Sequence, residues 1–177
     1  MSINIKKVID ICVKGKQLNL FNVGSRQWVS DGFAAYPLLG MPAFTESTIR
    51  ATYSIPDNVR VKEMGEQPWV YSFEDVERSE NQVFFEKIQL QIGTEPLTSV
   101  RTQAGVAFFA SKYLKPLEDG ENGSSGLYER INEAGQVYIV SKQGMMLEAV
   151  IVPMTNVVKP DWLEDLRELV GVLASTQ

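Results

Sequence analysis

A chain of 177 residues with 44% hydrophobic and 22% charged residues fits one ordinary globular domain with its own core. It contains no histidine, which excludes Ser-His-Asp and Cys-His catalysis and removes the commonest imidazole metal ligand. The net charge of −5 argues weakly against a nucleic-acid partner. We therefore expect a protein that is not an enzyme, although a carboxylate-only active site stays open.

The first segment, residues 3–13, is predicted to be a helix. Its apolar side chains recur at three- and four-residue spacings and form one stripe: Ile5, Val8, Ile9, Cys12 and Val13. Gly15 can end this helix, and the β-branched residues make a strand the alternative. Cys12, the only cysteine, is predicted to lie in the core, and the absence of a disulfide indicates a reducing, cytoplasmic location.

Strands with one short helix are predicted next. Alternating side chains and turn residues indicate four strands, at 17–23, around Trp28–Val29, at 33–38 and at 59–64. Thr45 followed by Glu46 indicates the start of a helix over 45–53. Residues 65–82 are polar and acidic, and they are predicted to form an irregular insertion or a strand with a loop.

In the second half, a helix is again predicted to precede several strands. A strand at 83–92 is followed by a helix over 107–117, in which Pro116 marks the last turn. Three further strands are predicted at 127–131, 136–141 and 146–152. Residues 160–174 form an amphipathic helix, with Pro160 in its first turn and an apolar stripe of Trp162, Leu163, Leu166, Leu169, Val170 and Leu173.

The two halves resemble each other, since each has a helix followed by several antiparallel strands. We therefore expect an α+β fold in which residues 1–156 form a duplicated helix-plus-antiparallel-strands domain. The amphipathic helix within residues 157–177 either packs on this domain or mediates self-association. We predict no secretion signal, and no apolar stretch approaches the roughly 20 residues that span a bilayer.

Candidate ligand sites are weak. Residues 118–126, EDGENGSSG, lack the lysine of a phosphate loop and the final Glu of an EF-hand, so a flexible loop is predicted. Glu74, Asp75 and Glu77 could serve carboxylate chemistry or a metal, but consecutive charges usually form a solvated face. Arg26 beside Trp28 could stack on bases, although an alternating Trp is more often a core residue. No catalytic residue, metal or cofactor is predicted.

Positive charge is concentrated near the start of the chain. Residues 1–62 hold eight Lys or Arg and four Asp or Glu, a net +4, which leaves −9 for residues 63–177. A basic face on an acidic body can bind a polyanion locally. An ordinary scatter of surface charge is the alternative.

Three segments resemble parts of bacterial sliding DNA clamps. Residues 107–117, AFFASKYLKPL, resemble a pore-facing helix of the clamp, and residues 29–38, VSDGFAAYPL, resemble its Asp-Gly strand-turn-strand segment. Residues 136–154, QVYIVSKQGMMLEAVIVPM, resemble the clamp's terminal strands. The chain departs from the family at Phe33-Ala34, where clamps often have His-Arg.

The resemblance implies a non-catalytic, DNA-clamp-like accessory module. Lysines on two neighbouring helices would contact the phosphates of double-stranded DNA without reading bases: Lys6, Lys7, Lys14, Lys112 and Lys115. Pro153 and Met154 would lie where clamps bind partner peptides. Because one domain cannot encircle a duplex, a homo-oligomer is implied. The alternative is a protein-interaction or assembly module of the same fold without DNA binding, and a carboxylate-dependent nuclease is a third reading.

Overall fold

The computed structural model describes residues 3–66, 68–117 and 125–154, except the side chains of residues 88 and 89. The helical elements are α1 (Ile5–Lys14), α2 (Glu46–Tyr53) and two 3-10 turns, η1 (Ser111–Tyr113) and η2 (Lys115–Leu117). The strands are β1 (Gln17–Val23), β2 (Arg26–Ser30), β3 (Ala34–Pro37), β4 (Arg60–Glu66), β5 (Asn81–Ile92), β6 (Glu95–Thr102), β7 (Gly105–Ala110), β8 (Gly126–Ile131), β9 (Val137–Gln143) and β10 (Met146–Ile151). The fold is α+β.

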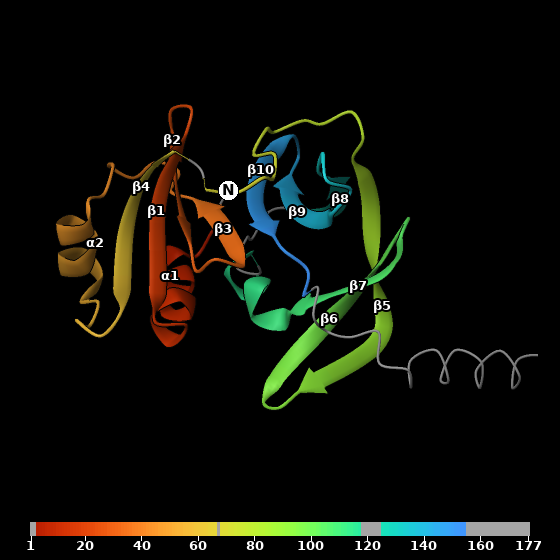
Figure 1. The fold of residues 1–177 in the computed structure, drawn as a ribbon, viewed down its shortest axis with the longest axis horizontal. Helices are drawn as coiled ribbons and strands as arrows, with labels where there is room; N and C mark the ends of the chain where they lie inside the picture. The colour runs from red at the N-terminus through yellow and green to blue at the C-terminus, as the bar shows by residue number, and fades with distance from the viewer. Residues whose placement is uncertain (1–2, 67, 118–124, 155–177) are drawn as a thin grey trace, which may run out of the picture.

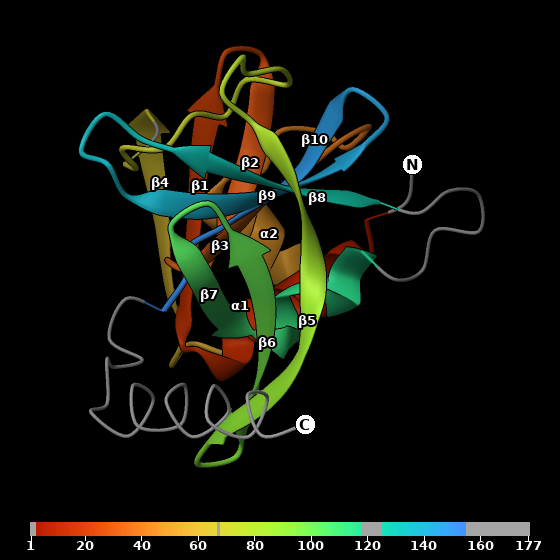
Figure 2. The ribbon, with the colours of Figure 1, turned by 90° about the vertical axis from the view of Figure 1, so that its right-hand side faces the viewer.

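The strands form one sheet in the order β4-β1-β2-β3-β10-β9-β8-β5-β6-β7 (Figure 1). The meander β1-β2-β3 and the meander β8-β9-β10 meet where Ala35 of β3 pairs with Val150 of β10. Among the strands that the structure describes, all the pairings are antiparallel except that of β1 with β4, which is parallel. The long strand β5 pairs with β8 near its start and with β6 further along, so the β5-β6-β7 part turns away from the central strands (Figure 2).

Apolar side chains alternate between the two faces of the sheet and build a core on each. One core lies under α1 and includes Leu20, Val29 and Ile139, together with Val100 and Phe109 of β6 and β7. The other core lies on the opposite face and contains Phe21, Trp28, Tyr138 and Val150. Since neighbouring residues of a strand point to opposite faces, one alternating sequence supplies both cores.

Residues 68–80, before β5, cover the second core. Phe73 is buried and meets the ring of Trp28 edge-on, with ring centres 4.8 Å apart. Trp69 and Tyr71 pack at the margin of the same core. The irregular insertion predicted from the sequence therefore covers the second hydrophobic core.

Within the described ranges, α1 and α2 both begin with a side-chain cap. The Asn4 side chain accepts a hydrogen bond from the Lys7 N–H, and the Thr45 side chain accepts one from Thr48. These caps satisfy amide groups that have no partner within the helix. The helix predicted over 3–13 and the cap predicted at Thr45 are confirmed, and Cys12 lies in the core as expected. Within the described residues, no helix has the length and apolar character needed to cross a membrane.

The helix predicted over 107–117 is wrong. Residues 105–110 form strand β7, and only two short 3-10 turns follow. Strand β6, which was not predicted, pairs with β7 from Thr102–Gly105 to Leu97–Ala110. Gly105 has a φ of +124°, which suits glycine at the turn into β7. Pro116 also cannot donate a backbone hydrogen bond within a helix. The helix predicted over 160–174 and most of the loop predicted over 118–126 lie outside the described residues.

Candidate nucleic-acid interface

Helix α1 presents a cationic side to solvent. Its buried side consists of Val8, Ile9, Ile11 and Cys12. At about 100° per residue, Lys6, Lys7 and Lys14 fall within one arc on the other side of the helix, together with Asp10. Lys6, Asp10 and Lys14 are exposed, whereas Lys7 is half-buried. The helix therefore offers three lysines and one carboxylate on a single surface.

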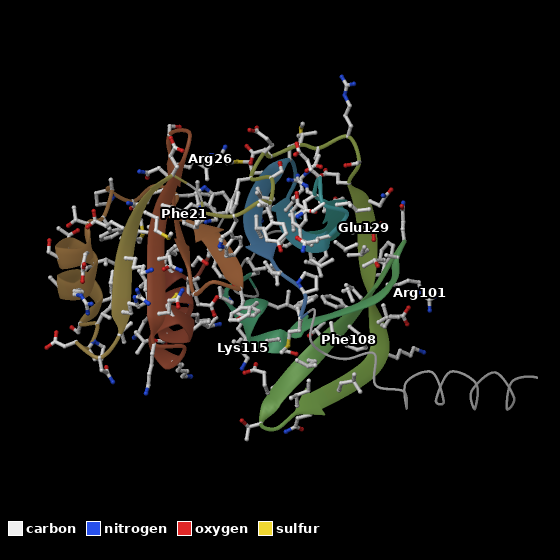
Figure 3. The ribbon with its side chains drawn as sticks, in the orientation of Figure 1. Phe21, Arg26, Arg101, Phe108, Lys115 and Glu129 are labelled. Carbon is white, nitrogen blue, oxygen red and sulfur yellow. The ribbon has the colours of Figure 1, made fainter. Side chains whose placement is uncertain are left out.

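The two 3-10 turns pack against this helix, so the five predicted lysines come from adjoining segments. The N–H of Asn4 donates to the carbonyl of Pro116 at 2.9 Å, and Lys7 Nζ donates to the carbonyl of Lys115 at 3.3 Å. Leu114 and Leu117 pack on the core that α1 covers. Figure 3 shows Lys115 at this junction, well separated from Arg26. Exposed Lys115 therefore lies beside the cationic side of α1.

Lys112 differs from the other lysines because its charge is already paired. Its Nζ lies 3.4 Å from a carboxylate oxygen of Glu95 and 5.2 Å from the ring centre of Tyr113. The side chain is about one-third exposed. Because the carboxylate and the aromatic ring already interact with its ammonium group, Lys112 should attract a polyanion less strongly than Lys6 or Lys14 does.

A buried hydrogen-bond chain holds the 3-10 turns in place. The hydroxyl of Tyr113 donates to Asp31 Oδ2 at 2.9 Å, and the hydroxyl of Tyr36 donates to the carbonyl of Tyr113 at 2.7 Å. Burial and then the charge of Asp31 raise the pKa of the Tyr113 and Tyr36 phenols well above the ordinary range. Both hydroxyls therefore stay protonated and donate, which fixes η1 against the turn that precedes β3.

Pro153 and Met154 lie between the start of β3 and strand β7. The N–H of Val152 donates to the carbonyl of Phe33 at 2.8 Å, and the N–H of Met154 donates to the carbonyl of Phe108 at 2.8 Å. Pro153 is half-buried and Met154 is exposed. Residues 29–38, 107–117 and 136–154 thus touch one another through Asp31–Tyr113, Phe33–Val152 and Phe108–Met154.

Comparison with known proteins gives no relative. No protein-family model, curated protein or solved structure matches the chain.

In the acidic segment beside the second core, cations hold Asp75 and Glu77, whereas Glu74 is exposed as expected of a solvated face. Arg26 donates two 2.7 Å hydrogen bonds to Asp75, one to each carboxylate oxygen. Asp75 also accepts a hydrogen bond from the N–H of Leu147 at 2.9 Å. The hydrogen bond from Arg26 is the main reason that the pKa of Asp75 is lowered. The guanidinium of Arg26 is therefore paired with Asp75, and Trp28 is buried in the core. Neither side chain is available to stack on a base.

A second ionic cluster surrounds Arg130, whose side chain is 0% exposed. Its guanidinium donates to Glu80 at 2.6 Å and to the carbonyl of Glu74 at 2.8 Å, and Glu77 lies 3.6 Å away. Glu80 also accepts a hydrogen bond from Lys142. Burial opposes the charge of Glu80, but the hydrogen bonds from Lys142 and Arg130 outweigh it, so the pKa of Glu80 is lowered. These groups tie residues 74–80 to strands β8 and β9.

The two ionic clusters join residues 74–80 and β2 to the strands around them. Their carboxylates are neutralised by arginine and lysine, and none of the pKa values resolved in them is raised toward that of a general acid. In the described ranges, no group of three or more Cys, Asp or Glu side chains is placed to hold a metal ion. Sequence reasoning missed both clusters because their partners lie about 50 to 60 positions apart in the chain. The exposed lysines of α1 lie outside both ionic clusters.

Proposed function

We propose that this protein is a non-catalytic, DNA-associated accessory module with a clamp-like, duplicated architecture. The observation that carries the proposal is the packing of the turn bearing Lys115 against the cationic side of α1. It joins positively charged groups from two distant parts of the chain on one surface. Such a surface can hold a DNA backbone through diffuse phosphate contacts that do not read bases.

The topology supports the duplication. Helix α1 precedes the meander β1-β2-β3, and the 3-10 turns η1 and η2 precede the meander β8-β9-β10. The last strands of the two meanders, β3 and β10, are paired at the centre of the sheet. In this proposal η1 and η2 stand where the second helix of the duplicated unit is expected. The first residues of the helix predicted over 107–117 belong to strand β7.

The three clamp-like segments support the same reading by their mutual contacts. Residues 29–38 meet residues 107–117 through the Asp31–Tyr113 hydrogen bond. Residues 136–154 meet both of the other segments through the N–H groups of Val152 and Met154. The three segments therefore share one junction in the fold, as the parts of one clamp-like unit would.

The charge balance is compatible with weak, nonspecific binding. The chain is acidic as a whole, with a net charge of −5, but only the face that meets DNA needs to be basic. Asp10 lies among the lysines of α1 and limits the attraction. We therefore propose low affinity that falls steeply with salt, and stable encirclement of a duplex would need several copies of the chain.

The test is binding of a labelled DNA duplex, followed by fluorescence anisotropy at several salt concentrations. We expect binding at low salt, and affinity should fall by a factor on the order of ten or more between about 50 and 200 mM salt. The variant Lys6→Glu/Lys14→Glu should weaken binding and reduce the salt slope by roughly one for each phosphate that the protein no longer neutralises.

The matched control is Arg78→Glu/Lys87→Glu, which makes the same change in net charge at two exposed residues outside α1 and the 3-10 turns. It should reduce affinity much less than the α1 variant. If no DNA binding is detected at low salt, the proposal is wrong. Equal losses of affinity in the two variants would also contradict it, because the net charge and not the α1 surface would then govern binding. A stable oligomer that binds no DNA would instead favour an assembly module of the same fold.

A further inference from the structure

A cavity opens between the start of β5 and the turn that joins β6 to β7. Its volume is about 390 Å³, which lies within the range of small-molecule sites. The lining includes Phe84, Phe85, Glu86, Arg101, Gln103 and Glu129. Figure 3 shows Arg101 and Glu129 at the side of the molecule that carries β5, well apart from Lys115. The cavity therefore lies away from the lysines of α1.

Glu129 is a buried carboxylate in this lining, and no cation pairs with it. It is 2% exposed, and its Oε2 accepts a hydrogen bond from the N–H of Gln103 at 2.8 Å. Among the residues that the structure describes, this is its one hydrogen bond, and none of them forms an ion pair with it. By contrast, Asp75 and Glu80 both have arginine partners. Because an ionised carboxylate removed from water without a cation costs free energy, the cavity favours a positively charged ligand.

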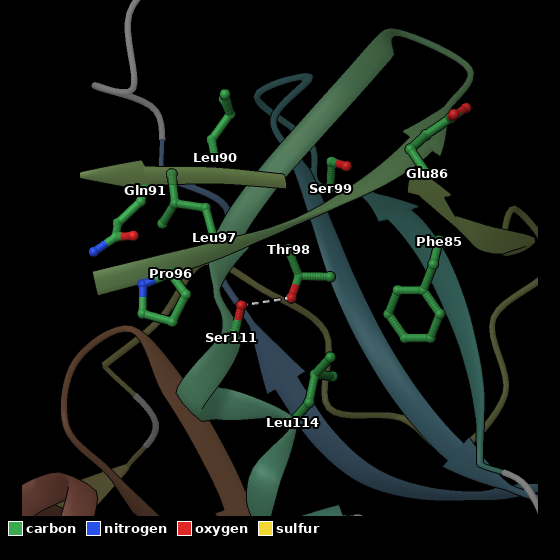
Figure 4. A pocket seen from close by; sticks show the side chains of 10 residues that line it. All are labelled: Phe85, Glu86, Leu90, Gln91, Pro96, Leu97, Thr98, Ser99, Ser111 and Leu114. Atoms are coloured by element: carbon green, nitrogen blue, oxygen red, sulfur yellow. Dashed lines mark hydrogen bonds between the residues drawn. The ribbon is translucent and has the colours of Figure 1, made fainter. Parts of the chain in front are cut away.

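The other charges of the cavity are paired with each other. Arg101 donates a hydrogen bond to the carboxylate of Glu86, so its guanidinium already has an acidic partner. Phe85 and Glu86 also line a neighbouring cavity of about 540 Å³, and Figure 4 shows their side chains leaving β5 in opposite directions. The lining of the smaller cavity holds two carboxylates and one guanidinium, a net charge of −1 at neutral pH. Glu129 therefore supplies the charge that is left unbalanced.

The exposed ring of Phe85 lies on the same face of the sheet as Glu129. Val83 pairs with Leu127, and both belong to the core under α1. Phe85 and Glu129 each lie two positions from this pair in their own strands, so they share that face. Glu129 pairs with Asn81, four positions before Phe85, which corresponds to roughly 13 Å along the strand. Since Phe85 is 60% exposed, it offers an apolar surface at one end of the cavity, and Glu129 offers a negative charge at the other.

We propose that this cavity binds an organic cation on an apolar stem, with a guanidinium or ammonium head at Glu129 and the stem along Phe85. The arginine or lysine side chain of a partner and a free alkylguanidine or alkylamine share this chemistry. A metal ion is a poorer match, because Mg²⁺ and Ca²⁺ take about six or more oxygen ligands. Among the described residues, no group of three Cys, Asp or Glu side chains is placed to hold one. Binding at this cavity does not depend on DNA binding.

The test is a titration of the full-length chain with butylguanidinium, followed through the backbone amide signal of Gln103 in two-dimensional NMR spectra. This N–H donates to Glu129, so a cation bound at the carboxylate should shift its signal. Butylurea has nearly the same shape and no charge, which makes it the neutral counterpart. We expect butylguanidinium to shift the Gln103 signal to saturation and butylurea at the same concentrations to leave it in place.

A second arm of the test separates the two sources of the cation. It uses a capped Gly-Arg-Gly peptide, with the citrulline peptide as its neutral counterpart. Tighter binding of the arginine peptide than of butylguanidinium would support a basic side chain of a partner as the occupant. Tighter binding of butylguanidinium would support a free small cation.

Glu129→Gln removes the charge and keeps an oxygen that can accept from the Gln103 N–H. It should raise the dissociation constant of butylguanidinium about tenfold or more, because a hydrogen bond to a charged group is lost. Glu133→Gln, the matched control at an exposed carboxylate in the turn after β8, should change it less than about twofold. Phe85→Ala, at an exposed position that the fold tolerates, should raise it about threefold or more, and this variant decides the test if Glu129→Gln does not fold.

Three results would overturn the proposal. Butylguanidinium might leave the Gln103 signal in place, or butylurea bind as tightly as the cation. Glu129→Gln and Glu133→Gln with equal dissociation constants would show that the net charge of the protein, and not the buried carboxylate, attracts the cation. An unchanged dissociation constant in Phe85→Ala would remove the stem contact in the same way.

Discussion

The hydroxyl of Tyr113 donates a 2.9 Å hydrogen bond to Oδ2 of Asp31, which ties the 3-10 turn after β7 to the turn before β3. The other carboxylate oxygen of Asp31 accepts hydrogen bonds from the N–H groups of Phe33 and Ala34. Asp31 therefore organises its own turn and anchors the segment that carries Lys112 and Lys115. The partners of this hydrogen bond lie 82 residues apart in the chain.

We expect Tyr113→Phe to destabilise the protein. The change removes a donor to a charged acceptor, and such hydrogen bonds contribute roughly 1.5–3 kcal/mol. Urea denaturation should show this decrease in the free energy of unfolding. Tyr53→Phe is the control, because the hydroxyl of Tyr53 only contacts the Met41 sulfur at 3.9 Å, a weak acceptor. Similar stabilities for the two variants would mean that the Asp31 hydrogen bond contributes little.

Arg130→Met should be among the most destabilising single changes. It removes a fully buried cation and leaves the Glu80 carboxylate and the Glu74 carbonyl without that partner. Removal of one member of a buried ion pair costs about 3–5 kcal/mol. Arg78→Met, at an exposed arginine of the same covering segment, should change stability by no more than about 0.5 kcal/mol. Denaturant midpoints of both variants test this, and a decrease in stability at Arg130 as small as that at Arg78 would contradict it.

The Arg26–Asp75 pair should make stability depend on pH at the acidic end. The folded-state pKa of Asp75 is lowered, chiefly by the hydrogen bond from Arg26. Stability from the pair is therefore present above the unfolded-state pKa of about 3.9 and is lost as the pH falls through the lower folded-state value. Arg26→Gln should be less stable than the parent at pH 7, and the difference should narrow below about pH 4.

Urea titrations from pH 7 to pH 2 would measure this difference. Arg78→Gln serves as the control, because it removes an equal charge at an exposed position. A difference in stability between the parent and Arg26→Gln that stays constant over the whole range would show that the ion pair is not its source.

Charge reversal at Lys112 should affect DNA binding less than charge reversal at Lys14. Lys112 already lies 3.4 Å from Glu95 and over the ring of Tyr113, whereas Lys14 is exposed on the last turn of α1. Anisotropy titrations at low salt should therefore give a larger rise in the dissociation constant for Lys14→Glu than for Lys112→Glu. The reverse order would place the DNA contact at η1 and not along α1.

Local sequence patterns predicted the elements that depend on near neighbours. The three- and four-residue spacing of Val8, Ile9 and Cys12 predicted α1, and Thr45 predicted the start of α2. The strands of both meanders follow alternation and turn residues. These features are set within a few positions of each other, so they can be inferred before any tertiary contact is known.

The same reasoning failed where a distant strand decides the outcome. Phe109, Tyr113 and Leu117 have helical spacing, yet residues 105–110 pair with β6 and become a strand. Asp75 and Glu77 have the sequence of a solvated acidic stretch, yet Arg26 and Arg130 hold them against the second core. Pairing and charge neutralisation across the sheet outweigh local propensity in both cases.

The sequence by itself determined an α+β chain with an amphipathic, lysine-bearing first helix, buried Cys12 and no histidine chemistry, because composition and short-range periodicity fix these properties. Only the tertiary structure decided that β3 and β10 join the two meanders, that Tyr113 reaches Asp31, and that Lys115 lies beside α1. These contacts join residues many positions apart. They form only when the whole sheet buries its two apolar faces, and no local pattern encodes which distant partner each group will meet.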